Sequence, residues 1–352
     1  MSDLPKPSRI LVVMLRRIGD VVLTTPAVRA LRKLYPEAEL DFLVEPPCGE
    51  ILEGNPDISR VLLCERRRGP AGLAAHWRSI RAVRSGNYDW VIDYMGNPRS
   101  AIITALSGAA VRAGPSHVFH RWAYNRALDQ SEAVFYGARE KIRVLRSLGL
   151  DPDEDDYLPR LDIAPESGER ARRALEELGW TGSPGIIGLV PASRKITRRW
   201  PARHFMKLGR LLRDRYWEGA RILVFWGPGE EPLAREIVQG IGQDAASAPA
   251  TASLRDLAAL LKECRLVITN CNGPKHIAVA AGVPTLTIHG SSDPRSWNPP
   301  SDPRFGVVRR EELFCIGCRR NDCPYDLECL KDLAPEIVAR RAAEMLNAMR
   351  TV

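Results

Sequence analysis

The feature that most limits how this chain can fold is a repeated alternation of short apolar runs with amphipathic segments. The apolar runs are rich in β-branched and aliphatic residues, as expected of parallel strands that are covered on both faces. We expect strands at residues 10–15, 39–44, 90–93, 185–190, 221–226, 266–269 and 285–289. The segments between them have helical spacing, as in Leu257, Leu260, Leu261 and Cys264. The alternation predicts an α/β protein built from doubly wound sheets.

The alternation runs twice along the chain, which indicates two Rossmann-like domains. A length of 352 residues also exceeds the roughly 250–300 residues that one core usually supports. Gly, Pro and Ser gather near residues 181–185, after a helix expected at residues 166–178. We therefore predict an N-terminal domain at residues 1–180 and a C-terminal domain at residues 181–352. Pro335 begins a last expected helix.

The charge balance favours an anionic partner. Lys and Arg number 51 and Asp and Glu 43, giving a net charge of +8. This balance suits a phosphorylated ligand, a nucleic acid or an acidic membrane surface. Aromatic residues are not interleaved with the basic runs, so nucleic acid is not the expected partner. The N-terminus lacks the pattern of a signal peptide and no apolar run approaches ~20 residues, which predicts a cytoplasmic protein with reduced cysteines.

Ligands of open α/β sheets bind beyond the carboxyl ends of the strands, so the loops there hold the candidate site residues. The loop after the first expected strand contains Arg17, Gly19 and Asp20. A carboxylate in this position can remove a proton from an attacking hydroxyl. The alternative is that Asp20 caps the helix that follows.

Two loops of the second half carry charged residues. Ser193, Arg194 and Arg198 follow the strand expected at residues 185–190. Fixed cations there can neutralise charge on a leaving diphosphate. Glu230 follows the next strand and can accept hydrogen bonds from ribose hydroxyls, or it is an ordinary acid at a helix start.

The segment "TNCNGPKHIAVAAGVP", residues 269–284, predicts a tight corner from strand to helix. Gly273 permits a backbone conformation that other residues resist, and Pro274 fits a first helical turn. The amides of that turn favour an anion, to which Lys275 and His276 add charge or hydrogen-bond donors. A structural role is the alternative for His276.

Four cysteines lie close together near the C-terminus, with the spacing C-x2-C-x4-C-x5-C. They are Cys315, Cys318, Cys323 and Cys329. Four soft ligands this close are able to hold zinc or an iron–sulfur cluster. The alternative is a compact loop of reduced thiols.

The segments "RRIGDVVLTTPAVRALR", "RRWPARHF" and "SLRDLAALLKECRLVITNCNGPKHIAVAAGVPTLTIHGSSDP", with the cysteine segment after them, resemble glycosyltransferase family 9. This is the family of the lipopolysaccharide heptosyltransferases, and the resemblance covers nearly the whole chain. It implies a GT-B fold, in which two Rossmann-like domains face an interdomain cleft. It further implies an ADP-heptose donor held mainly by the second domain and a lipopolysaccharide inner-core acceptor held mainly by the first.

The resemblance also implies roles for single residues. Asp20 would be the catalytic base, and Arg198 the cation on the donor phosphates, where the family usually has lysine. The predicted acceptor-binding residues are Arg17, Gly19 and Arg99. The predicted donor-binding residues are Ser193, Arg194, Arg198, Glu230, Asn272, Gly273, Pro274, Lys275 and His276. The predicted reaction is an inverting transfer of heptose that requires no cofactor.

The chain departs from the family at the glycine corner. The family commonly has Asp followed by Ser or Thr before this glycine, whereas this chain has Cys271 and Asn272. A thiol is a weak hydrogen-bonding group in place of a carboxylate. The departure leaves open a different donor specificity or a non-catalytic nucleotide-sugar-binding protein. The basic charge, finally, predicts peripheral contact with the anionic inner membrane.

Overall fold

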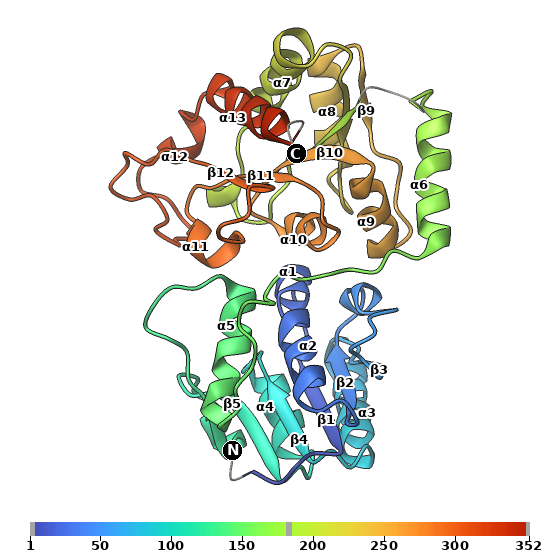
Figure 1. Cartoon of the computed structure of the whole chain (residues 1–352), viewed down its shortest axis with the longest axis vertical. Coiled ribbons are helices and arrows are strands. Elements are labelled where there is room, and N and C mark those ends of the chain that lie inside the picture. The colour runs from blue at the N-terminus through green and yellow to red at the C-terminus, as the bar shows by residue number, and fades with distance from the viewer. Residues whose placement is uncertain (1–3, 181–184, 350–352) are drawn as a thin grey trace. The chain divides into compact units, whose positions relative to one another are not determined.

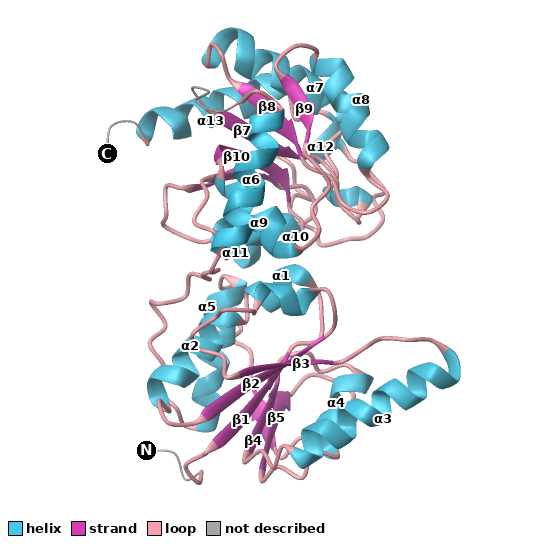
Figure 2. Cartoon of the chain, turned by 90° about the vertical axis from the view of Figure 1, so that its right-hand side faces the viewer, coloured by secondary structure: helices cyan, strands magenta, loops and turns pink. Residues whose placement is uncertain are grey.

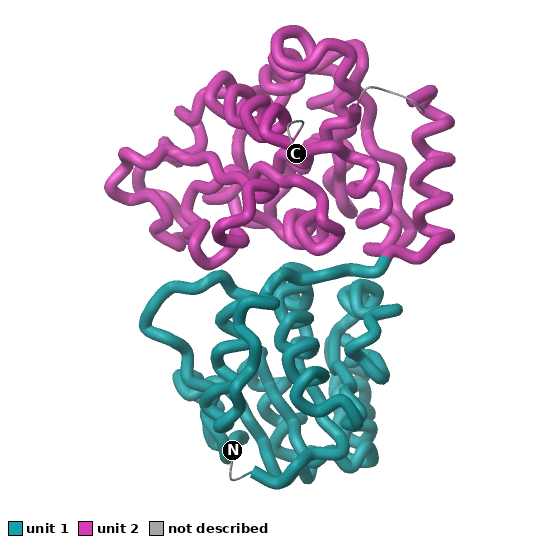
Figure 3. The backbone as a smooth tube through the Cα atoms, viewed as in Figure 1, with its two compact units in different colours: residues 1–162 teal, residues 163–352 magenta. Residues whose placement is uncertain are grey.

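The computed structural model describes residues 4–180 and 185–349. The chain forms two compact units, Met1–Asp162 and Ile163–Val352 (Figure 3). The predicted domain boundary at residues 181–185 falls mostly on residues 181–184, which lie outside the described residues. The unit boundary precedes helix α6 (Pro165–Glu177), because α6 packs on α9 (Leu254–Lys262) of unit 2. The predicted boundary at residue 181 places α6 in the N-terminal domain instead.

Unit 1 contains a six-stranded parallel sheet in the order β3-β2-β1-β4-β5-β6 (Figure 1). Its strands are β1 (Arg9–Val13), β2 (Glu39–Val44), β3 (Arg60–Leu63), β4 (Trp90–Asp93), β5 (Val111–Pro115) and β6 (Arg126–Leu128). Its helices are α1 (Ile18–Val22), α2 (Thr25–Leu34), η1 (Cys48–Ile51), α3 (Gly69–Ser85), α4 (Pro98–Ala105), η2 (Arg121–Ala123), α5 (Gly137–Arg143) and η3 (Val144–Leu148).

Unit 2 contains a second six-stranded parallel sheet, in the order β12-β11-β10-β7-β8-β9. Its strands are β7 (Ile186–Val190), β8 (Arg221–Val224), β9 (Ala245–Ser247), β10 (Cys264–Asn270), β11 (Thr285–Ile288) and β12 (Phe305–Val308). Its remaining helices are η4 (Ile196–Arg198), α7 (Ala202–Leu211), η5 (Leu212–Tyr216), α8 (Glu231–Ile241), α10 (Gly273–Ala280), α11 (Pro294–Trp297), α12 (Glu328–Lys331) and α13 (Pro335–Ala348).

Both sheets have the doubly wound Rossmann order, in which the chain moves outward from two central strands in opposite directions. The prediction of an α/β protein with two doubly wound Rossmann-like domains is therefore confirmed. Each of the seven strands predicted from an apolar run is present. They are β1, β2, β4, β7, β8, β10 and β11. The helix predicted from Pro335 is α13.

The central strands are apolar on both faces because helices cover both sides of each sheet. In β1, Ile10 and Val12 pack into one cluster with residues of α2 and α5, and Leu11 and Val13 into another with residues of α3 and α4. Figure 2 shows α3 and α4 on one side of this sheet and α2 and α5 on the other. Alternate residues of a strand point to opposite faces, so a continuous apolar run satisfies both clusters.

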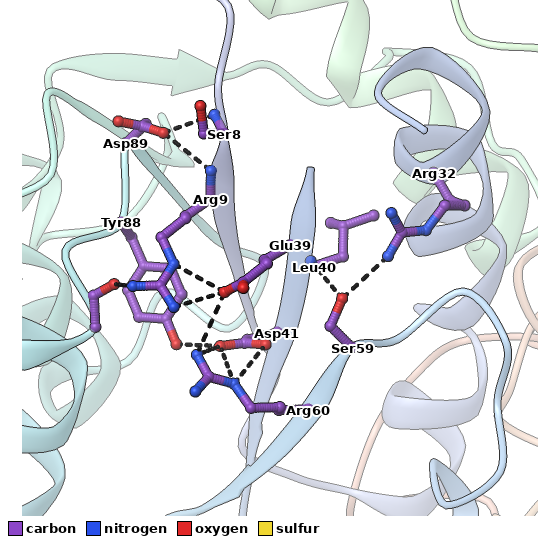
Figure 4. Close-up of polar contacts among 11 residues, drawn as sticks. Ser8, Arg9, Arg32, Glu39, Leu40, Asp41, Ser59, Arg60, Tyr88 and Asp89 are labelled. Atoms are coloured by element: carbon purple, nitrogen blue, oxygen red, sulfur yellow. Dashed lines mark hydrogen bonds and ion pairs between the residues drawn. The ribbon is translucent and has the colours of Figure 1, made fainter. Parts of the chain in front are cut away.

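Charged pairs close the amino ends of β1, β2 and β3 (Figure 4). Arg9 lies opposite Glu39 in register and contacts its carboxylate at 2.5 Å. Arg60 lies opposite Asp41, at 2.7 Å from its carboxylate, and the Tyr88 hydroxyl donates to the same carboxylate at 2.5 Å. Burial and the bond to Asp41 raise the pKa of Tyr88. The charged side chains at this end of the sheet are therefore bonded to one another. The carboxyl ends of the strands are the expected place for ligands.

None of the helices in the described residues is long and apolar enough to span a membrane.

Candidate active site

The central strands of each sheet mark where ligands bind in open α/β folds. In unit 1 the winding direction changes between β1 and β4, and in unit 2 between β7 and β10. The crevice beyond the carboxyl ends of such strands is the usual binding position. Asp20 follows β1, Ser193 follows β7 and Asn272 follows β10. The sequence-predicted residues therefore occupy loops beside the topological switch points of their own units.

Asp20 lies in the first turn of α1, and it does not cap this helix. The N-cap residue is Arg17, which makes no capping bond with its side chain. Asp20 is half-buried, and among the described residues its carboxylate has neither a hydrogen bond nor an ion pair. Its backbone carbonyl accepts a 2.7 Å bond from the Thr24 hydroxyl, which fixes the turn. The capping alternative is therefore wrong, and the carboxylate remains available to a ligand.

Lys141 on α5 is a candidate site residue that was not predicted from the sequence. Its ammonium lies 5.2 Å from the ring centroid of Tyr94, the residue that follows β4. Burial lowers the pKa of Lys141, while Asp20 and Asp93 act in the opposite direction. The cation is thus within electrostatic reach of Asp20. Nothing in the local sequence distinguishes it from other basic residues of an amphipathic helix.

Arg99 on α4 is held by groups from two neighbouring loops. Its Nη1 donates to Glu45 Oε1 at 2.7 Å, and its Nη2 donates to the backbone carbonyl of Glu65. Asn97 caps α4 through the Ser100 amide, which fixes the start of the helix. Arg99 therefore lies where loops follow β2 and β3, with its guanidinium already engaged. Its role in acceptor binding stays a prediction, as does that of the exposed Arg17 and the buried Gly19.

The corner between β10 and α10 is organised by Asn272, the N-cap of α10. Its Oδ1 accepts bonds from the Lys275 amide at 3.0 Å and from the Thr269 hydroxyl at 3.3 Å. Its Nδ2 donates to the Ala192 carbonyl at 2.8 Å, which ties the loop after β10 to the loop after β7. Cys271 is 4% exposed and occupies an apolar position. Both polar atoms of the Asn272 side chain therefore serve the corner itself.

The next residues of the corner differ from the expectation in one respect. Gly273 is the first residue of α10, and its φ is not among the positive values of the described glycines. The expectation of a special backbone conformation at Gly273 is therefore wrong, because a helical residue has an ordinary negative φ. Pro274 lies in the first turn of the helix, as predicted.

Lys275 is turned into the protein. Its side chain is fully buried and its ammonium donates to the backbone carbonyl of Trp297. Burial lowers the pKa of Lys275 to about 8, which the nearby Cys271 partly opposes. The ammonium of Lys275, which was predicted to lie beside the donor phosphates, is therefore hydrogen-bonded to the backbone of α11.

Trp297 brings together three groups of the predicted sugar-donor site. The His276 ring meets it edge to face at 5.9 Å, and the Arg198 guanidinium lies 5.9 Å from its ring centroid. Burial lowers the pKa of His276 well below its ordinary value, and the charges of Lys275 and Arg198 lower it further. His276 is therefore neutral at pH 7. Trp297 was not predictable from the sequence, because its contacts are with residues distant in the chain.

His289, at the end of β11, is a second buried histidine near this cluster. Burial and then the charge of Lys275 lower its pKa to about 3. Its Nδ1 lies 2.9 Å from the Ser292 hydroxyl. Among the described residues, the Nε2 atom of His289 and the Nδ1 atom of His276 have no hydrogen-bond partner. Positive charge in the cluster therefore resides on Arg198 and Lys275.

The other predicted donor-binding residues lie on the loops after β7 and β8. Ser193 is buried, and its carbonyl accepts a 2.6 Å bond from Arg199 Nη2. Arg194 is exposed. Glu230 is the N-cap of α8, and its Oε2 accepts a 3.0 Å bond from the Gly227 amide. The carboxylate of Glu230 thus fixes its own turn, and a contact with ribose stays a prediction.

The four C-terminal cysteines line a cavity of about 300 Å³. Burial raises the pKa of Cys329 to about 11, and the thiols of Cys323, Cys315 and Cys318 add to this. Within the described part of the chain, no three His, Cys, Asp or Glu side chains are placed to hold one metal ion. The cysteine segment is bonded to the loop after β7, since the Thr197 hydroxyl of that loop donates to the Arg320 carbonyl at 2.9 Å. Whether these cysteines bind zinc or an iron–sulfur cluster, or are reduced thiols, stays a prediction.

Comparisons with known proteins agree with this arrangement. The model of glycosyltransferase family 9, described as heptosyltransferase, matches residues 76–328. A lipopolysaccharide heptosyltransferase 3 of Escherichia coli is 27% identical, over 80% of this chain and 83% of that protein. A lipopolysaccharide heptosyltransferase 1 of Pseudomonas aeruginosa is 27% identical, over 98% of this chain and 99% of that protein. The crystal structure of a family 9 glycosyltransferase from Veillonella parvula superimposes with a TM-score of 0.85 at 25% identity, covering 97% of both chains.

Proposed function

The chain belongs to glycosyltransferase family 9, and on that premise we propose that it transfers heptose from ADP-heptose to an inner-core sugar of lipopolysaccharide. The chain is a glycosyltransferase, and its relatives in Escherichia coli and Pseudomonas aeruginosa are lipopolysaccharide heptosyltransferases. The ADP moiety is the donor nucleotide that the motif resemblance implies. In this proposal unit 2 holds the sugar donor and unit 1 holds the acceptor.

The proposed reaction is a single displacement at the anomeric carbon. Asp20 removes the proton from an acceptor hydroxyl, and the oxygen forms a bond to the anomeric carbon as the bond from that carbon to the diphosphate breaks. The electron pair of the broken bond leaves with ADP. Because the acceptor oxygen attacks the face opposite the leaving diphosphate, the configuration at the anomeric carbon inverts. A single carboxylate base on the attacking side is also what inverting glycoside chemistry uses. The support is the carboxylate of Asp20, which the described residues leave without a partner.

The leaving diphosphate requires positive charge and hydrogen-bond donors. Arg198 supplies the charge, and the start of α10 supplies the amides and the helix dipole. Because these groups stabilise the leaving group and Asp20 supplies the base, we propose that the transfer requires no cofactor.

The observation that carries the proposal is the closed corner at Asn272. The departure at Cys271 and Asn272 raised the alternatives of another donor or of binding without catalysis. The hydrogen bonds from Asn272 to Ala192 and from the Lys275 amide to Asn272 keep the β7 and β10 loops together and the helix start intact. The corner therefore retains the parts that bind an anion, with the cap supplied by an amide side chain.

The lipid-linked nature of a lipopolysaccharide acceptor fixes where the enzyme would work. We propose that it acts in the cytoplasm, at the inner face of the inner membrane. The net charge of +8 supports contact with anionic lipid there.

A thermal-shift titration with ADP, UDP, GDP and CMP tests the donor. A ligand that binds only the folded state stabilises it by about 2.7 kcal/mol at a hundredfold excess over its dissociation constant. We expect a selective shift with ADP, followed by transfer of heptose from ADP-heptose to a core oligosaccharide. A selective shift with another nucleotide would indicate that the sugar donor carries that nucleotide instead of ADP. Binding of ADP without transfer to any core acceptor would favour the non-catalytic alternative.

A further inference from the structure

Helix α3 of unit 1 presents an outward face that combines large apolar side chains with arginines. Leu73 is 66% exposed and Trp77 is 57% exposed. They lie one helical turn apart, with Arg81 one turn further on, so the three form one stripe. The residues that anchor the helix are Ser79, Ile80 and Val83, which are buried. The side chains of the stripe are therefore not needed to pack α3 against the rest of unit 1.

The charge around this stripe is predominantly positive. The loop before α3 contains Arg66, Arg67 and Arg68, and the helix itself contains arginines and no acidic residue. Glu65, the acidic residue beside them, contacts Arg67 at 2.9 Å and Arg78 at 3.9 Å. The surplus of arginine over carboxylate leaves this face strongly positive. Arg66 to Arg68 are exposed, as is Arg81.

The position of α3 leaves this face open to a flat partner. Figure 2 shows the end of α3 that follows the loop from β3 extending beyond the strands of its sheet. With 17 residues the helix is about 25 Å long. Such a helix can lie in the plane of a bilayer surface with its apolar stripe inserted at the level of the headgroups.

We propose that the α3 face, defined as Arg66 to Arg68 with Leu73, Trp77 and Arg81, docks unit 1 on a bilayer that contains anionic lipids. Trp77 would lie at the interface between headgroups and acyl chains, where indole rings are favoured, and Leu73 would insert beside it. The arginines meet the anionic headgroups. This inference deepens the proposed function, and rests on it for the reason why docking is useful: the acceptor of that reaction is anchored in the membrane.

The pairing of an aliphatic and an indole side chain argues against a nucleic acid on this face. Single-stranded nucleic acids bind where several aromatic rings stack successive bases along a basic groove. Trp77 is the aromatic residue of the stripe, and Leu73 offers nothing to a base. An apolar pair rimmed by arginines matches a lipid surface better.

Vesicle binding by the full-length protein tests the inference directly. The protein is mixed with vesicles of phosphatidylcholine alone, or of phosphatidylcholine with phosphatidylglycerol, and bound protein is separated by flotation. We expect binding to the mixed vesicles, weakened by salt, and little binding to phosphatidylcholine alone. Absence of binding to the mixed vesicles would overturn the inference, as would equal affinity for both compositions or tighter binding to RNA than to the vesicles.

Matched variants locate the surface. Arg66→Ser with Arg68→Ser should lower partitioning onto the mixed vesicles about tenfold or more. Arg172→Ser with Arg173→Ser removes the same charge from exposed positions of α6 and should change it little. Leu73→Ser with Trp77→Ser should likewise abolish most binding. The control is Phe119→Ser with Trp122→Ser, since these are 89% and 62% exposed on another loop of unit 1.

Loss of binding with the Phe119 and Trp122 variant, and not with the α3 variant, would overturn the inference by placing the surface elsewhere. Thermal unfolding of each variant checks that it is folded. Transfer to a water-soluble core oligosaccharide separates this inference from the proposed function. The α3 variants should retain that transfer and lose transfer to an acceptor embedded in vesicles. If the unchanged enzyme transfers to neither acceptor yet binds mixed vesicles, the proposed function fails and the docking surface stands.

Discussion

The side-chain amide of Asn272 donates to the backbone carbonyl of Ala192 at 2.8 Å, which joins the loops after β10 and β7 at the centre of the unit 2 sheet. The same side chain caps α10 by accepting from the Lys275 amide. Asn272→Ala removes these two bonds and also the 3.3 Å bond from the Thr269 hydroxyl. We expect a loss of about 1–2 kcal/mol in the free energy of unfolding, because a cap alone contributes about 1 kcal/mol. Urea unfolding measures this, and ADP titration should show weaker binding.

Asn272→Ser separates the two bonds. A serine caps a helix as well as asparagine does but does not reach the Ala192 carbonyl as a donor. We expect Asn272→Ser to recover the cap contribution and to retain the weakened ADP binding of Asn272→Ala. If both variants bind ADP as tightly as the unchanged protein, the link between the two loops has no part in sugar-donor binding.

Asp20→Asn tests the proposed base. The carboxylate lies in the first turn of α1 and has no partner among the described residues, so its replacement should leave the fold intact. Loss of a general base typically costs a factor of about 10²–10⁴ in rate. We therefore expect transfer to fall by that factor while the thermal shift with ADP is unchanged. Transfer within a few-fold of normal would remove Asp20 from the role of base.

The sequence was sufficient for seven of the strands, including the four beside the switch points, and insufficient for β5 and for the edges of the sheets. Strands predicted at residues 39–44 and 90–93 coincide with β2 and β4, because buried parallel strands are continuous apolar runs. The four edge strands, β3, β6, β9 and β12, were missed, as was β5 beside β6. Of these, β3, β6 and β9 are short and incompletely buried. A strand with a polar or small-residue composition gives no periodic signal, and only pairing with its neighbour defines it.

The candidate site divides in the same way. Asp20 and the corner at Asn272 were found because loops after predicted strands can be read from the chain. Trp297 and Lys141 were missed, because their partners lie far away in the sequence. The inward direction of Lys275 was also not predictable, since it depends on the carbonyl of Trp297. Tertiary contacts supply what the order of residues does not.

Trp297→Ala tests whether the indole ring positions Arg198. The ring contacts Arg198 and His276, whereas the bond from Lys275 is to the backbone carbonyl and survives the substitution. A cation–π contact is worth about 0.5–2 kcal/mol, so we expect ADP affinity to fall by about two- to thirtyfold. Trp77→Ala is the control, because this exposed residue belongs to unit 1. Equal ADP affinity in both variants would show that the ring has no such role.

Asp41→Asn tests the network of Figure 4. Asp41 is 1% exposed and accepts from Tyr88 and Arg60, so an amide there leaves buried partners poorly satisfied. We expect a loss of about 1–3 kcal/mol in the free energy of unfolding. Glu39→Gln removes a more exposed partner of Arg9 and should cost less than about 1 kcal/mol. Chemical denaturation measures the free energy of unfolding of both variants. Equal losses in the two would contradict the view that the burial of Asp41 makes its bonds more important than those of Glu39.

Lys275→Met should change stability in a way that depends on pH. Burial lowers the pKa of Lys275 from 10.5 to about 8, so below pH 8 the folded protein bears the full cost of a buried ammonium, about 3 kcal/mol. Between pH 8 and 10.5 the unfolded chain holds a proton that the folded chain has released, so this cost fades as the pH rises. Methionine has no such cost at any pH.

The stability of Lys275→Met relative to the unchanged protein should therefore be highest at pH 7 and fall by about 2–3 kcal/mol by pH 10. The lost bond to the Trp297 carbonyl offsets both values alike, so the difference between them isolates the charge. Urea unfolding at the two pH values measures it. Lys262→Met, at an exposed position on α9, is the control and should show no such change. A difference that does not vary with pH would mean that Lys275 is charged in the folded protein throughout this range.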